Sequence, residues 1–415
     1  MSAGQPPVAV VGAGPVGLTA ALVLARGGVP VTVLEQLPAL STASRASTFH
    51  PATLDLLDEL GVSAALHRQG REVTRIQWRG LDGEVHAELD YALLAGHTTH
   101  PHRLHVEQSR LTPLLLAALE ATGLADVRFG RTVTGVRQTA TGVELTARSG
   151  GGEEVRETFG HVVAADGSRS AVRDAAGLPS RARDYPHYAL RVVTDSPLDR
   201  LEPGLSPLTY VRDPRISFSV LGMPDHWRLI FRIPHGTPRA DVLAPGAVRE
   251  LVARALPRAG AALPIAEATT YRLAAFLLPD YRVGRLLFAG DAAHLTSTAG
   301  GMNMNCGLHD AVHIGRALTA VLTGDADEGV LAEAARQRRA VAESAVIPRS
   351  EARTAGLDGA AALRGALEAV RRTAADPASA TDYLIKASLL DVAPRPTTRD
   401  ERGTADAHLV SQAHG

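Results

Sequence analysis

The start of the chain alternates between apolar runs and a glycine-rich turn. Val8–Val11 is a continuous apolar run, Gly12–Gly17 is rich in glycine, and Leu18–Arg26 has the content of a buried helix. Val31–Glu35 is a second apolar run that ends in a carboxylate. Continuous apolar runs joined by a helix are typical of parallel strands buried on both faces. We therefore predict a strand–helix–strand unit here.

The same stretch raises the question of a membrane span. From Val8 to Ala25 only Thr19 is plainly polar, and 18 residues approach the length that a spanning helix needs. However, three glycines and a proline interrupt the stretch, and no basic region precedes it. We expect no membrane segment.

Further along, apolar and polar positions alternate. Glu72–Trp78 and Glu84–Tyr91 flank a turn at Leu81-Asp82-Gly83, which predicts an antiparallel hairpin. Short alternating segments between Tyr188 and Ile233 predict a second, mainly antiparallel sheet. Helices are expected at Pro51–Leu60, Val106–Thr122 and about Asn305–Leu322, and over most of 326–396.

Charge and cysteine content narrow the function classes. The net charge is -1, which gives no reason to expect nucleic acid or an anionic membrane as a partner. Cys306 is the single cysteine, so intramolecular disulfides and cysteine-based zinc sites are excluded. We expect a cytoplasmic protein without a bound metal.

The glycine-rich turn carries the first chemical signal. Gly12-x-Gly14-x-x-Gly17 joins the first predicted strand to its helix, and Glu35 ends the next strand. Such glycines allow a tight turn, close approach of a pyrophosphate and close packing of helix and strand. The acidic residue is placed to bind an adenosine ribose. This spacing predicts a dinucleotide site and leaves NAD and FAD both open.

Two later motifs decide between the two cofactors. In the first, a strand ends at Asp166-Gly167 before a segment rich in Ser and Arg, and in the second Gly290-Asp291 precedes the loop 299–305. Each alone is also explained as a helix cap. In this order behind the glycine turn, they resemble the motifs of class A flavoprotein monooxygenases, which have the p-hydroxybenzoate hydroxylase fold. The resemblance covers about Val8 to Ser350.

The resemblance implies an FAD site and its residues. Gly12, Gly14, Gly17 and Glu35 would hold the ADP half, Gln108 would lie near the ribityl chain or the ring, and Asp291 would bind a ribityl hydroxyl. A helix beginning at about Asn305 would direct its positive end at the ring. The full set of expected FAD-binding residues is Gly12, Gly14, Pro15, Val16, Gly17, Glu35, Arg45, Gln108, Asp166, Asp291, Gly301, Met302, Asn303, Met304 and Asn305.

The implied fold is α/β. It combines a Rossmann-like FAD-binding domain of the GR2 type, with a parallel sheet, an interleaved antiparallel substrate-domain sheet and a C-terminal helical region. The expected limits are 1–71, 98–178 and 275–325 for the FAD-binding domain, 72–97 and 179–274 for the substrate domain, 326–396 for the helical region and 397–415 for a mobile tail.

The implied activity is hydroxylation of an aromatic or other electron-rich ring. NADH or NADPH reduces FAD, O2 adds to give a C4a-hydroperoxyflavin, and one oxygen reaches the substrate. Related flavoenzymes with Baeyer–Villiger, dehydrogenase or halogenase chemistry are alternatives, although a halogenase would need a Trp-x-Trp-x-x-Pro segment, which this chain lacks. A flavin-binding protein without turnover is another alternative. The partners expected are an aromatic small molecule and O2, acting on a monomer or homodimer.

No catalytic side chain is predicted, because the flavin carries the reaction. Many family members have proline where this chain has Ser297-Thr298, and many have glycine at Asn303. The two hydroxyls either contact the substrate or cap the following turn. We expect His50, His294, His309 and Cys306 to be structural. The candidates for the substrate pocket are Ser297, Thr298, Tyr210, Phe218, His226, Arg228 and Phe231.

Overall fold

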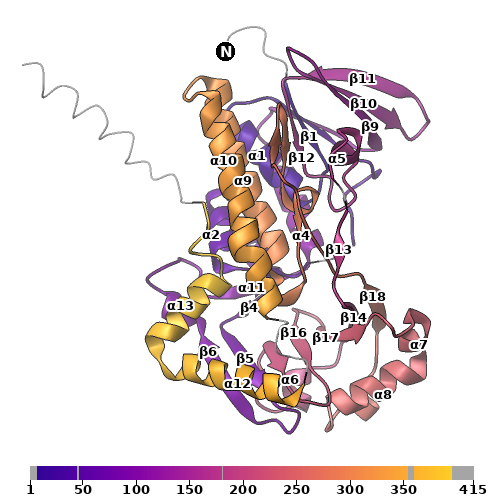
Figure 1. Cartoon of the computed structure of the whole chain (residues 1–415), viewed down its shortest axis with the longest axis vertical. Coiled ribbons are helices and arrows are strands. Elements are labelled where there is room, and N and C mark those ends of the chain that lie inside the picture. Colours follow the sequence, from indigo (N-terminus) through magenta and orange to yellow (C-terminus); the bar gives the residue numbers. More distant parts are fainter. Residues whose placement is uncertain (1–6, 44–45, 180, 354–358, 395–415) are drawn as a thin grey trace, which may run out of the picture.

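The protein has two stacked parts (Figure 1). A computed structural model describes residues 7–43, 46–179, 181–353 and 359–394. The parallel sheet and its helices form the upper part in Figure 1, and a larger sheet forms the lower part. The long helices α9 (Met302–Thr323) and α10 (Glu328–Val341) run beside the upper part.

The upper sheet is parallel except at one edge. Its central strands are buried throughout, because their apolar residues are covered on both faces. Only β20, at the edge, runs antiparallel to its neighbour. In spatial order the strands are β20 (Arg282–Val283), β21 (Leu286–Phe288), β12 (His161–Ala164), β1 (Val8–Val11), β2 (Val31–Leu34) and β8 (Ala125–Arg128).

Helices cover one face of this sheet and a small antiparallel sheet covers the other. The helical layer shares one large apolar core with β1 and β2. The small sheet contributes Val133, Val143 and Phe159 to a second core. The helical layer consists of α1 (Pro15–Arg26), α2 (Pro51–Glu59), α3 (Ser63–His67), α4 (Gln108–Glu120) and α9, and the small sheet of β9 (Arg131–Gln138), β10 (Val143–Ser149) and β11 (Glu154–Phe159).

The lower sheet contains the predicted hairpin. Strand β5 pairs in parallel with β15, which joins the hairpin to strands more than a hundred residues later in the chain. In spatial order the strands are β18 (Glu267–Tyr271), β14 (His187–Thr194), β17 (Trp227–Pro234), β16 (Phe218–Gly222), β15 (Leu208–Val211), β5 (Arg75–Arg79) and β6 (Val85–Asp90). Helices α6 (Leu198–Leu201), α7 (Arg239–Leu243) and α8 (Pro245–Ala255) accompany it.

Two short sheets join the parts. One consists of β3 (Thr48–Phe49), β7 (Arg103–His105) and β4 (Arg71–Val73), and the other of β13 (Arg183–Asp184), β19 (Ala274–Leu277) and β22 (His294–Leu295). Short helical turns lie at Tyr91–Leu94, Ala171–Ala175, Gly260–Ala262, Gly290–Ala292 and Ala299–Gly301.

The C-terminal stretch is helical and reaches the lower sheet. Helix α10 continues through a π-helical turn at Ala342–Val346 into α11 (Ile347–Ala352). Helices α12 (Ala360–Ala375) and α13 (Pro377–Ala387) then pack beside β5 and β6 (Figure 1). This contact places C-terminal residues against the face of the sheet that carries Tyr210.

Most expected elements are confirmed, with shifted helix starts. Helix α1 begins at Pro15, three residues before the predicted Leu18, because proline is favoured in the first turn of a helix. Helix α9 begins at Met302 rather than at about Asn305, since Gly301 already ends the preceding turn in the left-handed region. Among the described residues, no helix is both long and apolar enough to cross a membrane.

Candidate functional site

The three glycines of the first turn have different surroundings. A Cβ on Gly12 would lie 2.5 Å from the carbonyl oxygen of Ala165, and one on Gly17 would lie 1.9 Å from that of Gly12. At Gly14, by contrast, no described atom lies within 4 Å of the Cβ position. The outer glycines are therefore needed for packing, whereas Gly14 borders open space. This is the arrangement that a bound pyrophosphate requires.

Two carboxylates flank this turn. Glu35 accepts hydrogen bonds from the backbone N–H of Ala13 (2.7 Å) and of Leu37 (2.9 Å), which holds it against the turn. Asp166 follows β12, and its Oδ2 accepts from the N–H of Val172 at 3.1 Å. Its Oδ1 is buried without a hydrogen-bond partner in the described chain, and burial raises the pKa of Asp166. A buried orphan oxygen here fits a polar ligand that binds over the turn.

Val16 packs against two later glycines, Gly290 and Gly307. A Cβ on Gly290 or on Gly307 would lie 2.9 Å from the Cγ2 of Val16. The side chain of Val16 therefore packs between the Gly290 turn and helix α9. It positions the two FAD motifs against each other, and any contact of Val16 with FAD would come from its backbone.

The loop before α9 leaves the first backbone donors of this helix without a side-chain cap. Gly300 and Gly301 have φ of 83° and 68°, values that strongly favour glycine. Helix α9 is 22 residues long, has no acidic residue in its first turn, and Gly301 at its N-cap offers no side chain. Its first N–H groups and positive dipole end are therefore directed to the space beyond the loop.

Buried side chains clamp this loop. The carbonyl oxygen of Gly300 accepts from His50 Nε2 at 2.9 Å and from Arg103 at 3.3 Å. Burial, followed by the charges of Arg103 and Arg353, lowers the pKa of His50 well below its usual value, so its ring is neutral. Asn305 accepts from the N–H of His50 and donates to the carbonyl oxygen of Gly301. The loop conformation is therefore fixed by the protein itself.

The side chains of Met302, Met304 and Asn305 face inward. Met302 is buried with Cys306, and Met304 packs against the main core. The hydrogen bonds of Asn305 are made to backbone groups of the protein. Any contact of these residues with FAD would therefore be made through their backbone, as it would at Gly301, which has no side chain.

A chain of hydrogen bonds connects Asp291 to a buried ion pair. Asn303 Nδ2 donates to Asp291 (2.7 Å), and Asn303 Oδ1 lies 3.0 Å from His294 Nδ1. His294 Nε2 lies 2.8 Å from Asp310, which also accepts from Arg338 Nε at 2.8 Å. Asn303, where glycine is common in the family, thus links the proposed ribityl-binding carboxylate to the core.

The direction of the hydrogen bonds in this series requires that both ring nitrogens of His294 carry a proton. Because Asp291 can only accept, Asn303 must donate to it and present its oxygen to His294 Nδ1. Asp310 also only accepts, so His294 Nε2 must donate as well. Although burial opposes it, Cys306 and Asp310 raise the pKa of His294 well above its usual value. Both arguments make His294 an imidazolium at neutral pH.

We expect this charge to make stability depend on pH in the alkaline range. When folding raises the pKa of a histidine, its protonated ring stabilises the folded state. This contribution is complete at pH values below the pKa of the unfolded state, about 6.5, and is lost as the pH rises through the pKa of the folded state. The unfolding free energy of the parent should therefore fall relative to that of His294→Gln as the pH rises from neutral. Urea unfolding of both proteins at several pH values measures the difference. A difference that does not change with pH would show that His294 is neutral.

One face of the lower sheet carries side chains that lie near the loop of Gly300 and Gly301. Tyr210 pairs with Trp78 and with Ser219, and Ser219 pairs with Ile230, so all four share one face. Arg353, which follows α11, donates to the Tyr210 hydroxyl at 3.4 Å. Its side chain also lies against Gly300, since a Cβ there would be 2.8 Å from Arg353 Cδ. Tyr210 and the loop thus meet at Arg353.

Positive charge gathers around Tyr210. Burial alone would raise the pKa of Tyr210, but Arg353, Arg103 and Arg212 outweigh it and lower the pKa. The Arg353 guanidinium lies 5.6 Å from the ring centre of Tyr383 in α13. A buried face with surplus positive charge beside the loop is suited to an anionic ligand.

The other pocket candidates have separate places. Arg228 shares the Tyr210 face, since it lies two residues before Ile230, and it forms an ion pair with Glu107 together with His226. The expectation that Phe218 and Phe231 line the pocket is wrong. They stack at 5.0 Å on the opposite face, in the core shared with α8, because strand alternation turns them away.

Ser297 and Thr298 differ in exposure. The Ser297 hydroxyl is buried, lies 2.8 Å from that of Ser350 and accepts from the N–H of Ala299. These contacts favour the turn-capping interpretation for Ser297. Thr298 is exposed and its side chain lies close to Tyr271, so of the two it is the one that stays a candidate for substrate contact.

Two expected FAD contacts need separate mention. Arg45 lies outside the described residues. Gln108 is the first residue of α4, and its N–H donates to the carbonyl oxygen of Ala46. Four residues near the Gly300 loop were not predicted from the sequence, because no local pattern marks them. Arg103 and Arg353 contact the loop, and Tyr91 and Tyr383 lie against these two arginines.

Comparison with known proteins agrees with the motifs. A family described as FAD binding domain matches residues 5–348. Para-nitrophenol 4-monooxygenase of Pseudomonas sp. (strain WBC-3) is 30% identical over 80% of this chain and 83% of that protein. Aklavinone 12-hydroxylase of Streptomyces purpurascens is 32% identical over 82% of this chain, which spans only 66% of that protein.

Solved structures agree with this assignment. The p-nitrophenol 4-monooxygenase from Pseudomonas putida DLL-E4 has a TM-score of 0.86 at 28% identity, covering 94% of this chain and 99% of that one. A ternary complex of aklavinone-11 hydroxylase with FAD and aklavinone has a TM-score of 0.73 at 29% identity, covering 85% and 69%. The expected fold and the monooxygenase assignment are confirmed. The chain belongs to the FAD-dependent aromatic monooxygenases of the p-hydroxybenzoate hydroxylase-like family.

Proposed function

We propose that this monooxygenase hydroxylates an acidic phenol, which binds as the phenolate beside Arg353 and Tyr210. The observation that carries the proposal is the surplus of arginine around Tyr210 next to Gly300. Relatives named for p-nitrophenol and pentachlorophenol act on phenols whose substituents favour ionisation. A phenolate is also the more electron-rich form of the ring, which suits transfer of an electrophilic oxygen from O2.

The proposed FAD site uses the residues around the two glycine loops. Gly12, Gly14 and Gly17 would receive the pyrophosphate at the N-terminus of α1, and Glu35 would bind the ribose with its remaining lone pairs. Asp291, fixed by Asn303, would accept from a ribityl hydroxyl. We also propose Pro15, Val16, Arg45, Gln108, Asp166, Gly301, Met302, Met304 and Asn305 as FAD contacts.

The chain's own contribution to the reaction is positioning and electrostatics. FAD, when bound, supplies electron transfer from NADH or NADPH and activation of O2. The N-terminus of α9 stabilises negative charge beside the loop without a charged side chain. Arg353 holds the phenolate oxygen, and the Tyr210 hydroxyl, which accepts from Arg353, donates its own hydrogen to the phenolate. The hydrogen bonds from His50 and Arg103 to the Gly300 carbonyl oxygen hold the loop before α9 in place.

The remaining expectations are part of the same proposal. We propose that the FAD-binding and substrate parts have the limits 1–71, 98–178 and 275–325, and 72–97 and 179–274. We further propose a helical region at 326–396, a cytoplasmic location and a monomeric or homodimeric state. Gel filtration with light scattering measures the last of these directly. The tail expected at 397–415 lies outside the described residues.

A pair of matched compounds tests the substrate class. p-Nitrophenol ionises, whereas its methyl ether p-nitroanisole has nearly the same ring and cannot. We expect p-nitrophenol to accelerate NAD(P)H oxidation by the FAD-loaded protein and the ether to have little effect. Equal stimulation by both compounds would contradict phenolate recognition.

Arg353→Met should weaken phenol binding. A hydrogen bond to a charged group is worth about 1.5–3 kcal/mol, so KM for the phenol should rise roughly 10- to 150-fold. FAD binding should be retained, because Arg353 is not among the proposed FAD contacts. Arg364→Met, at an exposed position of α12, is the matched control and should behave as the parent. An unchanged KM in Arg353→Met would remove this residue from the substrate site.

A further inference from the structure

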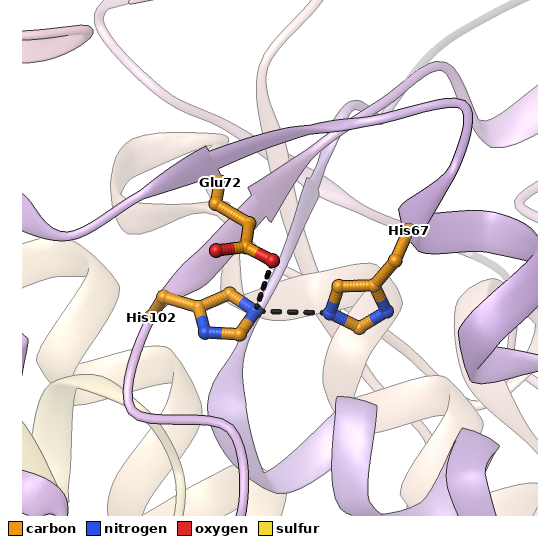
Figure 2. A group of neighbouring side chains, drawn as sticks. All are labelled: His67, Glu72 and His102. Atoms are coloured by element: carbon orange, nitrogen blue, oxygen red, sulfur yellow. Dashed lines mark hydrogen bonds and ion pairs between the residues drawn. The ribbon is translucent and has the colours of Figure 1, made fainter.

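Three potential metal ligands converge where α3 meets the short sheet of β3, β7 and β4. His67 ends α3, Glu72 lies in β4, and His102 precedes β7. Figure 2 shows the two imidazole rings pointing at each other, with the Glu72 carboxylate beside His102. The two Nε2 atoms are 2.9 Å apart, and Glu72 Oε1 lies 3.9 Å from His102 Nε2. The three ligand atoms all lie within 4.8 Å of one another.

The surrounding residues prepare His67 to act as a ligand. His67 Nδ1 lies 2.8 Å from the carbonyl oxygen of Ser63, which can only accept, so the ring proton is on Nδ1 and the Nε2 lone pair is free to bind. The ring of His100 stacks on His67 with centroids 5.3 Å apart. His100 is itself held by Asp55 at 2.8 Å. Metal-binding histidines are oriented by outer contacts of this kind.

The spacing is close to that of a tetrahedral site. Ligand atoms at about 2.0–2.1 Å from a zinc ion in tetrahedral geometry are roughly 3.3 Å apart. The two Nε2 atoms need to separate by a few tenths of an ångström, and Glu72 needs to move a little closer. The Glu72 side chain is 58% exposed, so it is free to make this movement.

We propose that His67, Glu72 and His102 bind one zinc ion, with water as the fourth ligand. Two imidazoles and a carboxylate form a donor set that Zn²⁺ favours. Without the ion, His102 Nε2 donates to His67 Nε2; binding requires that proton to move to His102 Nδ1. The ion would join α3, β4 and the start of β7. The proposal does not depend on the phenol substrate.

A second group, His294, Cys306 and Asp310, is a weaker candidate. Its carboxylate already accepts from Arg338 Nε at 2.8 Å, and both nitrogens of His294 donate. A guanidinium and an imidazolium would repel a cation there. Its sulfur ligand also gives the two candidates different spectroscopic signatures.

Zinc affinity tests the site directly. The probe is ZnCl2, titrated in competition with a chromophoric chelator into FAD-loaded protein that carries no histidine tag and has been treated with EDTA. We expect one equivalent to bind tightly. Loss of an outer partner alone typically costs 10- to 100-fold in affinity, so His67→Ala and His102→Ala should each lose at least about 100-fold. His97→Ala, an exposed histidine of the same connection, is the matched control.

Two further measurements cover variants that fail to fold. Glu72→Gln changes an exposed side chain and should fold normally, yet bind zinc about 10-fold or more weakly. The zinc absorption edge of the parent should show nitrogen or oxygen neighbours at about 2.0–2.1 Å and no sulfur at about 2.3 Å. The proposal would be overturned if the parent bound no stoichiometric zinc or if the bound zinc had a sulfur neighbour. It would also be overturned if the parent, Glu72→Gln and the histidine variants that fold bound zinc with equal affinity.

Discussion

Gly14→Val should abolish tight FAD binding while leaving the apoprotein folded. No described atom lies within 4 Å of the Cβ position at Gly14, and its φ is not in the left-handed region, so a side chain can be attached there without backbone strain or a clash at Cβ. The added methyl groups instead occupy the space where the pyrophosphate approaches the turn. We expect FAD affinity to fall at least about 100-fold, or about 2.7 kcal/mol.

Unfolding and FAD titration together separate this effect from misfolding. The free energy of unfolding of apo Gly14→Val should stay within about 1 kcal/mol of the parent, as for many substitutions without steric conflict. Gly17→Ala is the informative contrast, because its Cβ would lie 1.9 Å from the Gly12 carbonyl oxygen and must disturb the turn itself. If Gly14→Val binds FAD as tightly as the parent, the pyrophosphate does not lie over this turn.

Asp310→Ala should be among the most destabilising single substitutions in the chain. Asp310 is fully buried and accepts from Arg338, His294 and the N–H of Gly290. Although burial acts in the other direction, His294 and Arg338 lower the pKa of Asp310 to about 2. Removing the carboxylate leaves buried positive charge without a counterion, a loss of about 3–5 kcal/mol.

The controls for Asp310 lie within the same chain. Asp382 forms an exposed i,i+4 ion pair with Lys386, so Asp382→Ala should cost only about 0.3–0.5 kcal/mol. Replacing both partners of the Asp310–Arg338 pair, as Asp310→Leu with Arg338→Met, should recover part of the loss. The Arg338 charge is then no longer left unpaired, and His294, the other partner of Asp310, can lose its proton. A cost below about 1 kcal/mol for Asp310→Ala, by urea unfolding, would mean that this cluster does not hold the Gly290 turn in place.

The local parts of the site could be predicted from the sequence. The Gly12–Gly17 turn and Glu35 lie within one strand–helix–strand unit, so their spacing alone implies their proximity. The hairpin around Asp82 is also local and is confirmed by the pairing of β5 with β6. Short-range periodicity carries information of this kind because the residues involved are close in sequence.

The convergence on Tyr210 could not be predicted. Alternation shows that Tyr210 and Phe218 lie on defined faces of their strands, but it does not show which face meets the flavin loop. Arg353 reaches Tyr210 only because α10 and α11 form a long continuous path back across the molecule. Similarly, the partner of Ser297 is Ser350, more than fifty residues away. Such contacts depend on tertiary packing and leave no local pattern.

Asn303 illustrates a departure from the family that structure explains. From the sequence alone, Asn303 stands out only because many family members have glycine at this position. The structure shows its amide between Asp291 and His294, with each end of the amide matched to one partner. A side chain at this position therefore joins Asp291, the carboxylate proposed to bind the ribityl chain, to the buried charge of His294, a role that glycine cannot have.

Incorporation of labelled oxygen tests the central claim most directly. The FAD-loaded protein, NADPH and p-nitrophenol are mixed under ¹⁸O2 in unlabelled water, and the product is analysed by mass spectrometry. We expect a hydroxylated aromatic product that carries one ¹⁸O atom from O2, with NADPH oxidised in step with its formation. Two results would contradict the assignment of this protein as an aromatic hydroxylase. In one, the oxygen in the product comes from water; in the other, every phenol that stimulates NADPH oxidation gives only peroxide and no hydroxylated product.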